Sequence, residues 1–252
     1  NKIYCLDALT GALIWNYTTG DDVGSSPAVA DSKVYVGSND KKIYCLDALT
    51  GTQIWNYTTG AFVFSSPAVA DGKVYVGSID NKTYCLDALT GALIWNYTTD
   101  GWVGSSPAAA DGKVYVGSND NRVYCLDALT GTLIWNYTTG GGVGPSPAVA
   151  DGKVYVGSSD KKVYCLDALT GMHIWNYTTG GPVGASPAVA NGKVYVGSYD
   201  NNLYCLDALT GTQIWNYTTG AGGSSPAVAD GKVYVGSIEK NVYCLDALTG
   251  AL

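Results

Sequence analysis

Seven cysteines are the first residues whose chemistry has to be considered. They occupy one position of a repeated string, YCLDALTG, at Cys5, Cys45, Cys85, Cys125, Cys165, Cys205 and Cys244. On equivalent strands of neighbouring repeats they would lie roughly 15 Å apart, whereas a disulfide requires Cα atoms within about 7 Å. The chain has a single histidine, His173, so a histidine-based metal cluster is ruled out. We expect seven free, buried thiols, no metal site and no cofactor.

Carboxylates recur in two sets. The first is Asp7 and its six equivalents within YCLDALTG, and the second is Asp40, Asp80, Asp120, Asp160, Asp200 and Glu239. Several carboxylates brought together could bind calcium. Isolated aspartates in turns more often accept hydrogen bonds from their own backbone. We therefore interpret both sets as turn-capping residues.

The triplet Asn-Tyr-Thr satisfies the acceptor pattern for N-glycosylation. It begins at Asn16, Asn56, Asn96, Asn136, Asn176 and Asn216, and Asn81-Lys82-Thr83 adds a seventh match. Six copies of one repeat count as little more than a single occurrence. The pattern nevertheless favours an extracellular or cell-surface protein.

These residues are positioned by an internal repeat. The string YCLDALTG begins at Tyr4, Tyr44, Tyr84, Tyr124, Tyr164, Tyr204 and Tyr243, so six starts are 40 residues apart and the last step is 39. Each unit contains four apolar segments separated by turn residues. We name them strands A (25–30), B (33–38), C (41–48) and D (53–59). Asp-Gly pairs between A and B favour a two-residue hairpin turn. Four antiparallel strands per unit of about 40 residues predict an all-β propeller, with residues 1–252 as a single domain. A β-solenoid is the alternative.

The blade number depends on the chain ends. Strands A, B and D occur six times and strand C seven times, so the C-terminal A, B and C strands lack a D strand that residues 13–19 could supply. This arrangement predicts six four-stranded blades closed by pairing of the N- and C-terminal strands. Residues 1–12 then nearly duplicate residues 240–251, so one of these two copies must be displaced or pair elsewhere. Seven blades are the alternative if the chain is incomplete.

Composition argues against nucleic acid binding and against a membrane-spanning segment. The formal net charge of −7 and the lack of a basic stripe argue against nucleic acid binding. No apolar run reaches 18 residues, so we expect no transmembrane segment.

The turn between strands C and D resembles the tryptophan-docking motif of PQQ (quinoprotein) dehydrogenase-type propellers, Ala-x-Asp-x-x-Thr-Gly-x-x-x-Trp. Here it reads Cys5, Asp7, Thr10, Gly11 and Trp15, with cysteine replacing alanine. Five further copies of the motif end at Trp55, Trp95, Trp135, Trp175 and Trp215. The resemblance implies that each Trp wedges between neighbouring blades. The family's enzymes hold PQQ between a Trp and a disulfide of adjacent cysteines, beside calcium. No two cysteines are adjacent here, so we expect a non-enzymatic branch without dehydrogenase activity; a PQQ-dependent dehydrogenase is a distant alternative.

The repeats differ most in the D–A and B–C connections, which antiparallel pairing places on one face. The residues there that we expect to contact a partner are Phe62, Phe64, Trp102 and Tyr199, with Ile79 and Asp22 beside them. Aromatic side chains on loops of a uniform scaffold are typical of binding surfaces. We therefore expect a non-catalytic scaffold that binds a protein or glycan through this face. A structural tile of a surface layer or filament is the alternative.

Overall fold

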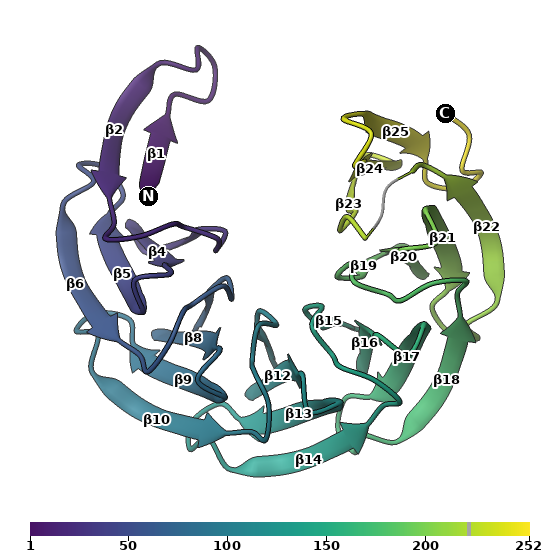
Figure 1. The fold of residues 1–252 in the computed structure, drawn as a ribbon, viewed down its shortest axis with the longest axis horizontal. Helices are drawn as coiled ribbons and strands as arrows, with labels where there is room; N and C mark the ends of the chain where they lie inside the picture. The colour runs from purple at the N-terminus through teal and green to yellow at the C-terminus, as the bar shows by residue number, and fades with distance from the viewer. Residues whose placement is uncertain (221–222) are drawn as a thin grey trace. The chain divides into compact units, whose positions relative to one another are not determined.

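The computed structural model describes residues 1–220 and 223–252, and all regular structure in this part of the chain is β-strand (Figure 1). Five sheets have four antiparallel strands in the order A, B, C, D. They are β3 (Ala28–Ala30), β4 (Lys33–Gly37), β5 (Lys42–Asp47) and β6 (Gln53–Thr58); β7 (Ala68–Ala70), β8 (Lys73–Ser78), β9 (Lys82–Asp87) and β10 (Leu93–Thr98); β11 (Ala108–Ala110), β12 (Lys113–Ser118), β13 (Arg122–Asp127) and β14 (Leu133–Thr138); β15 (Ala148–Ala150), β16 (Lys153–Gly157), β17 (Lys162–Asp167) and β18 (His173–Thr178); β19 (Ala188–Ala190), β20 (Lys193–Gly197), β21 (Asn202–Asp207) and β22 (Gln213–Thr218).

Two shorter sheets complete the described chain. The first pairs β1 (Lys2–Leu6) with β2 (Leu13–Thr18), and the last contains β23 (Ala227–Ala229), β24 (Lys232–Gly236) and β25 (Val242–Asp246). Residues 2–6 are therefore not displaced: β1 is the strand-C partner of β2, in a register that sets Cys5 opposite Trp15. The blade number, six or seven, and closure by the terminal strands stay predictions.

The chain divides into two compact units. The first comprises Asn1–Ser118 and Leu126–Thr132, and the second comprises Asn119–Cys125 and Leu133–Leu252. Each unit is built from the same repeat, so the packing described below occurs separately in both. The single-domain organisation stays a prediction.

The hairpin turns have the geometry that their residues predict. Asp71 and Gly72 both have positive φ, 50° and 69°, between β7 and β8. Two consecutive residues with positive φ match the right-handed twist of the flanking strands, and Asp-Gly tolerates that conformation. Asp31 and Ser32 adopt the same turn with φ of 49° and 58°, so serine replaces glycine there at some cost in backbone strain.

Strand A is shorter than predicted, because a side chain replaces part of its ladder. In the first complete sheet the strand begins at Ala28 rather than residue 25. The Ser25 hydroxyl oxygen accepts a hydrogen bond from the Gly37 backbone N–H at 3.1 Å, and Ser65 does the same for Gly77 at 2.9 Å. Pro27 and its equivalents have no N–H to donate to a ladder.

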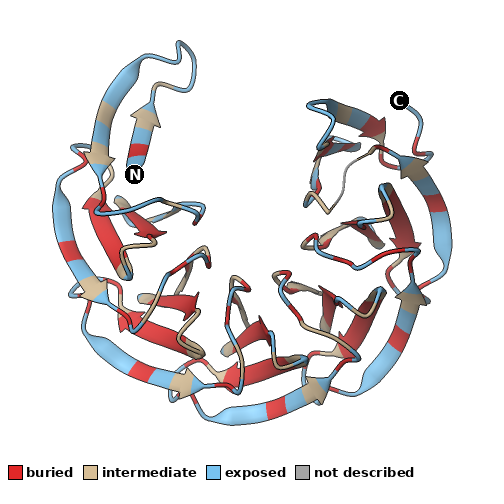
Figure 2. Cartoon of the chain, viewed as in Figure 1, coloured by how far each residue is buried: buried red, intermediate tan, exposed pale blue. Residues whose placement is uncertain are grey.

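The core lies between successive sheets of each unit. Strands B and C are buried along most of their length, whereas strand D is largely exposed (Figure 2). In the first unit, one cluster joins Tyr35, Cys45 and Trp55 of one sheet to Val74 and Leu86 of the next. Burial on both faces explains why strands B and C do not alternate between apolar and polar residues.

Hydrogen bonds between polar groups also link neighbouring repeats. The Ser26 backbone N–H donates to the Ser66 hydroxyl oxygen at 2.9 Å, and Ser66 N–H donates to Ser106 in the same way. In the second unit, Ser186 N–H donates to Ser225 at 2.9 Å. These contacts join residues one repeat apart, so within each unit a repeat is tied to the next one in sequence.

Candidate functional site

In both units, D–A loops are attached by their backbone to the B–C turn that follows them. The Asn39 N–H donates to the Asp22 carbonyl at 2.8 Å, and the Ile79 N–H donates to the Phe62 carbonyl at 3.1 Å. The A–B and C–D turns meet elsewhere, since the Ala88 N–H donates to the Gly72 carbonyl at 2.9 Å. Within each unit the variable connections therefore lie at one end of the strands and the uniform turns at the other.

Three consecutive D–A loops of the first unit carry the distinctive side chains. One loop position is occupied in turn by Asp22, Phe62 and Trp102, and the equivalent position in the second unit is Gly142 and then Pro182. Phe62 is 38% exposed and Trp102 is 58% exposed. A rigid repeated backbone thus presents different side chains from one fixed place.

Phe62 and Phe64 contact each other. Their ring centroids lie 6.0 Å apart at an interplanar angle of 81°, an edge-to-face pair. Phe64, 43% exposed, also lies over the preceding loop, where a Cβ on Gly24 would be 3.2 Å from its ring. The Val103 N–H donates to the Ser78 carbonyl at 3.2 Å, so the turn containing Ile79 is held between the loops of Phe62 and Trp102. We call residues Asp21, Asp22, Phe62, Phe64, Ile79 and Trp102 the aromatic–acidic patch.

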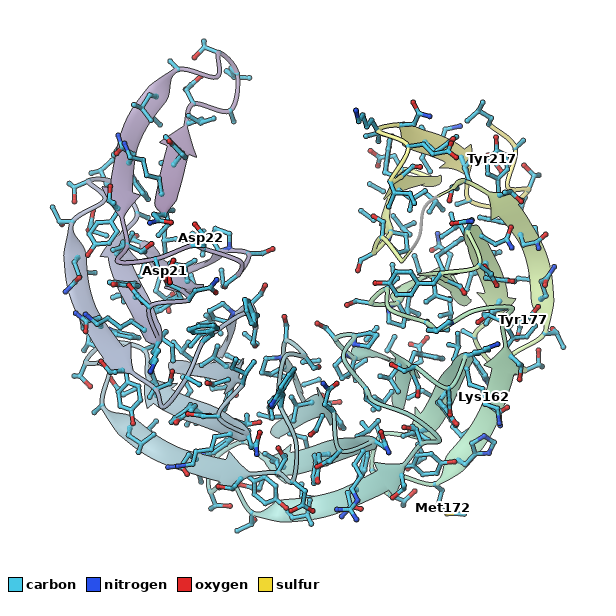
Figure 3. All side chains as sticks on the ribbon, viewed as in Figure 1. Asp21, Asp22, Lys162, Met172, Tyr177 and Tyr217 are labelled. Atoms are coloured by element: carbon cyan, nitrogen blue, oxygen red, sulfur yellow. The ribbon has the colours of Figure 1, made fainter. Side chains whose placement is uncertain are left out.

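The acidic part of this patch is exposed. Asp21 and Asp22 lie in the loop between β2 and β3 (Figure 3), and the Asp22 side chain is 75% exposed at 3.5 Å from the Asn1 amino group. Asp100 is a third exposed carboxylate in these loops. The loops 19–27, 59–67 and 99–107 contain three aspartates, three aromatic residues and no lysine, arginine or histidine. Ile79 is half-buried, so it supports the patch more than it extends its surface.

Tyr199, the remaining predicted binding residue, belongs to the second unit. It is 60% exposed and lies against glycines of its own unit: a Cβ on Gly184 would be 2.5 Å from its ring, and one on Gly223 would be 3.1 Å away. The D–A loops of this unit, 139–147, 179–187 and 219–226, contain no charged and no aromatic residue. Ala221 and Gly222 of the last of these loops lie outside the described residues. Tyr199 is thus the one aromatic side chain among the described D–A loops and B–C turns of this unit, where the B–C turn of the last repeat also carries the exposed Ile238.

The aspartates of the C–D turns cap their own backbone. Asp47 accepts hydrogen bonds through Oδ1 from the Leu49 N–H at 3.0 Å, the Thr50 N–H at 2.8 Å and the Thr50 hydroxyl at 2.9 Å. The bonds from Thr50, and then that from Leu49, lower the pKa of the Asp47 carboxyl. The motif residues Asp7, Thr10 and Gly11 form the same turn in the first repeat.

The second set of aspartates has a partner that the sequence analysis missed. Asp40 Oδ2 accepts hydrogen bonds from the Tyr44 hydroxyl at 2.6 Å and from the Gly20 N–H at 2.7 Å. Burial, together with the nearby Asp40 carboxylate, raises the pKa of Tyr44. The sequence signal for this contact is the constant four-residue spacing between Asp and Tyr in five repeats. It indicates a hydrogen bond that braces the B–C turn against strand C, rather than a metal ligand.

The repeated tryptophans pack on the following repeat. Trp55 Nε1 donates to the Ala88 carbonyl at 3.2 Å, and its ring lies over Gly91, where a Cβ would be 2.6 Å away. Trp15, Trp95, Trp135, Trp175 and Trp215 make the equivalent hydrogen bond to Ala48, Ala128, Ala168, Ala208 and Ala247.

All seven cysteines are free, but the prediction that all are buried is wrong for two of them. Cys5 is half-buried and Cys244 is exposed, because the sheets β1–β2 and β23–β25 have fewer strands than the others. Burial raises the pKa of Cys45 to about 11 and that of Cys85 to about 12. Each cysteine lies on its own copy of strand C. Cys45, for example, is opposite Tyr35 on one neighbouring strand and Trp55 on the other. This arrangement does not fit a quinone held against a disulfide of adjacent cysteines.

The six Asn-Tyr-Thr acceptor asparagines lie on strand D. Asn16, Asn56, Asn96, Asn136, Asn176 and Asn216 are all exposed. The tyrosine of the triplet packs against the next repeat. The ring centroids of Tyr57 and Tyr84, for example, are 5.8 Å apart. The acceptor amides are therefore accessible in every repeat.

Comparison with known proteins identifies the class. The crystal structure of BamB from Moraxella catarrhalis has a TM-score of 0.85 and 23% identity, covering 96% of this chain and 76% of that one. The computationally designed protein Ika8 has a TM-score of 0.85 and 20% identity, covering 93% and 74%, and a europium-containing methanol dehydrogenase has 0.84 and 16%, covering 99% and 73%. The fold is that of a PQQ-type β-propeller.

The family follows from the sequence itself. The family model described as outer membrane protein assembly factor BamB matches residues 1–83, 65–143 and 138–252. The chain belongs to this family. No curated protein sequence matches it. Among the described residues, there is no helix long and apolar enough to cross a membrane.

Proposed function

We propose that this protein is a non-catalytic scaffold that binds a protein partner through the aromatic–acidic patch. The observation that carries the proposal is the concentration of Phe62, Phe64 and Trp102 in two consecutive D–A loops, whereas the D–A loops of the second unit have no aromatic residue. The backbone of these loops is repeated, so the aromatic side chains are not needed to build it. Exposed aromatic groups of this kind supply most of the binding energy in protein interfaces.

The charge of the patch favours a partner surface with basic residues. Asp21 and Asp22 of the patch are exposed, and the faces of Phe62 and Trp102 can accept a cationic side chain. Arginine combines a charge for the carboxylates with a planar group that stacks on aromatic rings. Binding should therefore weaken as salt concentration rises, because exposed charges are screened.

Two features support an exported or cell-surface location. The matched family model is described as an outer membrane protein assembly factor, and the six acceptor asparagines are exposed. A protein-interaction scaffold agrees with the family description, and the separated cysteines offer no counterpart to the disulfide of the quinone-binding enzymes.

The experiment places a photo-crosslinking amino acid at Trp102 in one variant and at Gly142, its equivalent in the second unit, in a matched control. The expected result is a crosslinked protein at position 102 that is absent at position 142. Purified partner should then bind the triple variant Phe62→Gly, Phe64→Gly and Trp102→Gly at least about 30-fold more weakly. The variant should remain folded, since other repeats carry glycine at these positions.

Four results would contradict the proposal. Equal crosslinking at both positions, or full affinity in the triple variant, would show that the patch is not the binding surface. Patch-dependent binding to purified glycans but to no protein would replace the protein partner with a glycan. Turnover of an alcohol by the chain reconstituted with quinone and calcium would overturn the non-catalytic assignment.

A further inference from the structure

Strand D carries its Asn-Tyr-Thr triplet with the two reactive side chains on an exposed face. In β6, Trp55 and Tyr57 pack in the core cluster shared with the next repeat. Asn56 and Thr58 alternate with them and are both exposed, because successive side chains of a strand point to opposite faces. The asparagine and the threonine are exposed in the same way in β2, β10, β14, β18 and β22 (Figure 2). The amide and the hydroxyl of each triplet therefore lie side by side on the outward surface.

The seventh acceptor triplet, Asn81-Lys82-Thr83, lies in a different environment. Asn81 is half-buried in a B–C turn, with a positive φ of 69°. Thr83 is on β9 and fully buried, at the position that Ile43 occupies in the preceding repeat. Its hydroxyl has no hydrogen-bond partner within the part of the chain that the structure describes. The sequence pattern matches seven times, but the folded chain presents both side chains of the triplet only in strand D.

The chemistry of N-glycosylation depends on this difference. The asparagine Nδ2 forms a bond to the anomeric carbon of a lipid-pyrophosphate-linked oligosaccharide. The bond from that carbon to the pyrophosphate oxygen breaks, the lipid pyrophosphate leaves, and the amide gives up one proton to a base of the transferase. The acceptor pattern requires the threonine as well as the asparagine, so both side chains have to be reached. The attached glycan is bulky and has to remain on the surface of the finished fold.

We propose that strand D is N-glycosylated and that the fold excludes Asn81. The six sites are Asn16, Asn56, Asn96, Asn136, Asn176 and Asn216. Strand D is the terminal strand of every sheet that contains it, and it also presents exposed isoleucines such as Ile54 and Ile94, 44% and 42% exposed. An open edge strand with apolar side chains is prone to pair with another chain. Glycans at these sites cover the edge and the isoleucines beside it.

The test uses the intact chain purified from the organism that makes it. Proteolytic peptides are analysed by tandem mass spectrometry, and occupancy is read at each of the seven asparagines. The strand-D peptides are distinguishable because they extend into the variable D–A loops, which contain residues such as Phe62 and Trp102. The expected result is glycopeptides from strand D in both units and an unmodified peptide at Asn81. Strand-D asparagines that are all unmodified, or occupancy at Asn81 equal to theirs, overturns the proposal.

Variants produced in the same host test whether the triplet directs attachment. Thr58→Val removes an exposed hydroxyl and should abolish the glycan at Asn56 while leaving that at Asn96 unchanged. Thr58→Ser is the matched control: it keeps a hydroxyl at the same exposed position and should keep most of the glycan. Melting temperatures close to that of the parent chain verify that both variants are folded. A glycan at Asn56 that survives Thr58→Val, or that is lost equally in both variants, contradicts attachment through the exposed triplet.

Discussion

The indole ring of Trp55 lies so close to Gly91 of the next repeat that a Cβ there would be 2.6 Å from the ring. Gly91 also has a positive φ of 72°. One glycine thus meets two requirements, a left-handed turn and a close approach of an aromatic ring. The same pair recurs as Trp95 with Gly131 and as Trp175 with Gly211.

The first prediction concerns this contact. Gly91→Ala should lower the free energy of unfolding by about 2–4 kcal/mol, because it adds left-handed backbone strain to overpacking against Trp55. Gly72→Ala is the matched control: its φ is 69°, but no atom lies within 4 Å of the added Cβ. It should cost only about 1–2 kcal/mol. Thermal or denaturant unfolding measures both, and equal losses would show that the indole moves aside freely.

The second prediction concerns the brace between Asp80 and Tyr84. Asp80 Oδ2 accepts hydrogen bonds from the Tyr84 hydroxyl at 2.6 Å and the Gly60 N–H at 2.7 Å. Asp80→Ala should destabilise the protein by about 1–3 kcal/mol, because it leaves the buried tyrosine hydroxyl without its acceptor. In the Tyr84→Phe background the same substitution should cost less. A double-mutant cycle on the denaturation midpoints measures the difference, and strict additivity would argue against coupling.

The third prediction concerns thiol reactivity. At pH 8 a disulfide reagent should react rapidly with two thiols of the native chain, the half-buried Cys5 and the exposed Cys244. Buried thiols such as Cys45 and Cys165 should react only on unfolding, since burial raises their pKa to about 11 and about 12 and leaves little thiolate at pH 8. Denaturant should release all seven thiols. Seven fast thiols in the native state would mean that the strand-C cysteines are accessible.

The fourth prediction concerns acid stability. Hydrogen bonds from threonine lower the pKa of Asp47, Asp87 and their equivalents below the usual 3.8. A carboxyl whose pKa is lower in the folded state stabilises the fold fully above its unfolded pKa, about 3.9, and loses that contribution as pH falls through the folded value. The melting temperature should therefore vary little through these groups between about pH 5 and 7 and fall below about pH 4.

The control for this prediction is a change in the donor. Thr90→Val removes the hydroxyl that donates to Asp87 at 2.8 Å and should raise the pKa of that carboxyl toward 3.8. Carbon NMR titration of the labelled aspartates reads this shift directly. A pKa of Asp87 that is unchanged in the variant would show that the backbone N–H groups alone set it.

Local geometry was predictable from the sequence, because turn residues and strand patterns act over a few positions. The Asp71–Gly72 hairpin and the four-strand unit follow from residue types alone. The contact of Tyr35 with the Ala88 carbonyl was not predictable, since it joins residues 53 positions apart through a backbone atom that every residue has. The exposure of Cys5 and Cys244 depends on which strands cover each sheet, and sequence identity between repeats conceals that difference.

The near-identity of the repeats has a consequence for folding kinetics. Trp55 packs on Gly91, but Gly51 and Gly131 sit in the same motif and present the same surface to an indole. A partly folded chain therefore meets several contacts of nearly equal energy, of which one is native. Pairing that skips a repeat buries the same side chains and must be undone before the chain can proceed. We expect refolding from denaturant to be slow and heterogeneous. Sequence differences among the loops do not reduce the number of competing contacts, because those contacts lie in the strands and C–D turns.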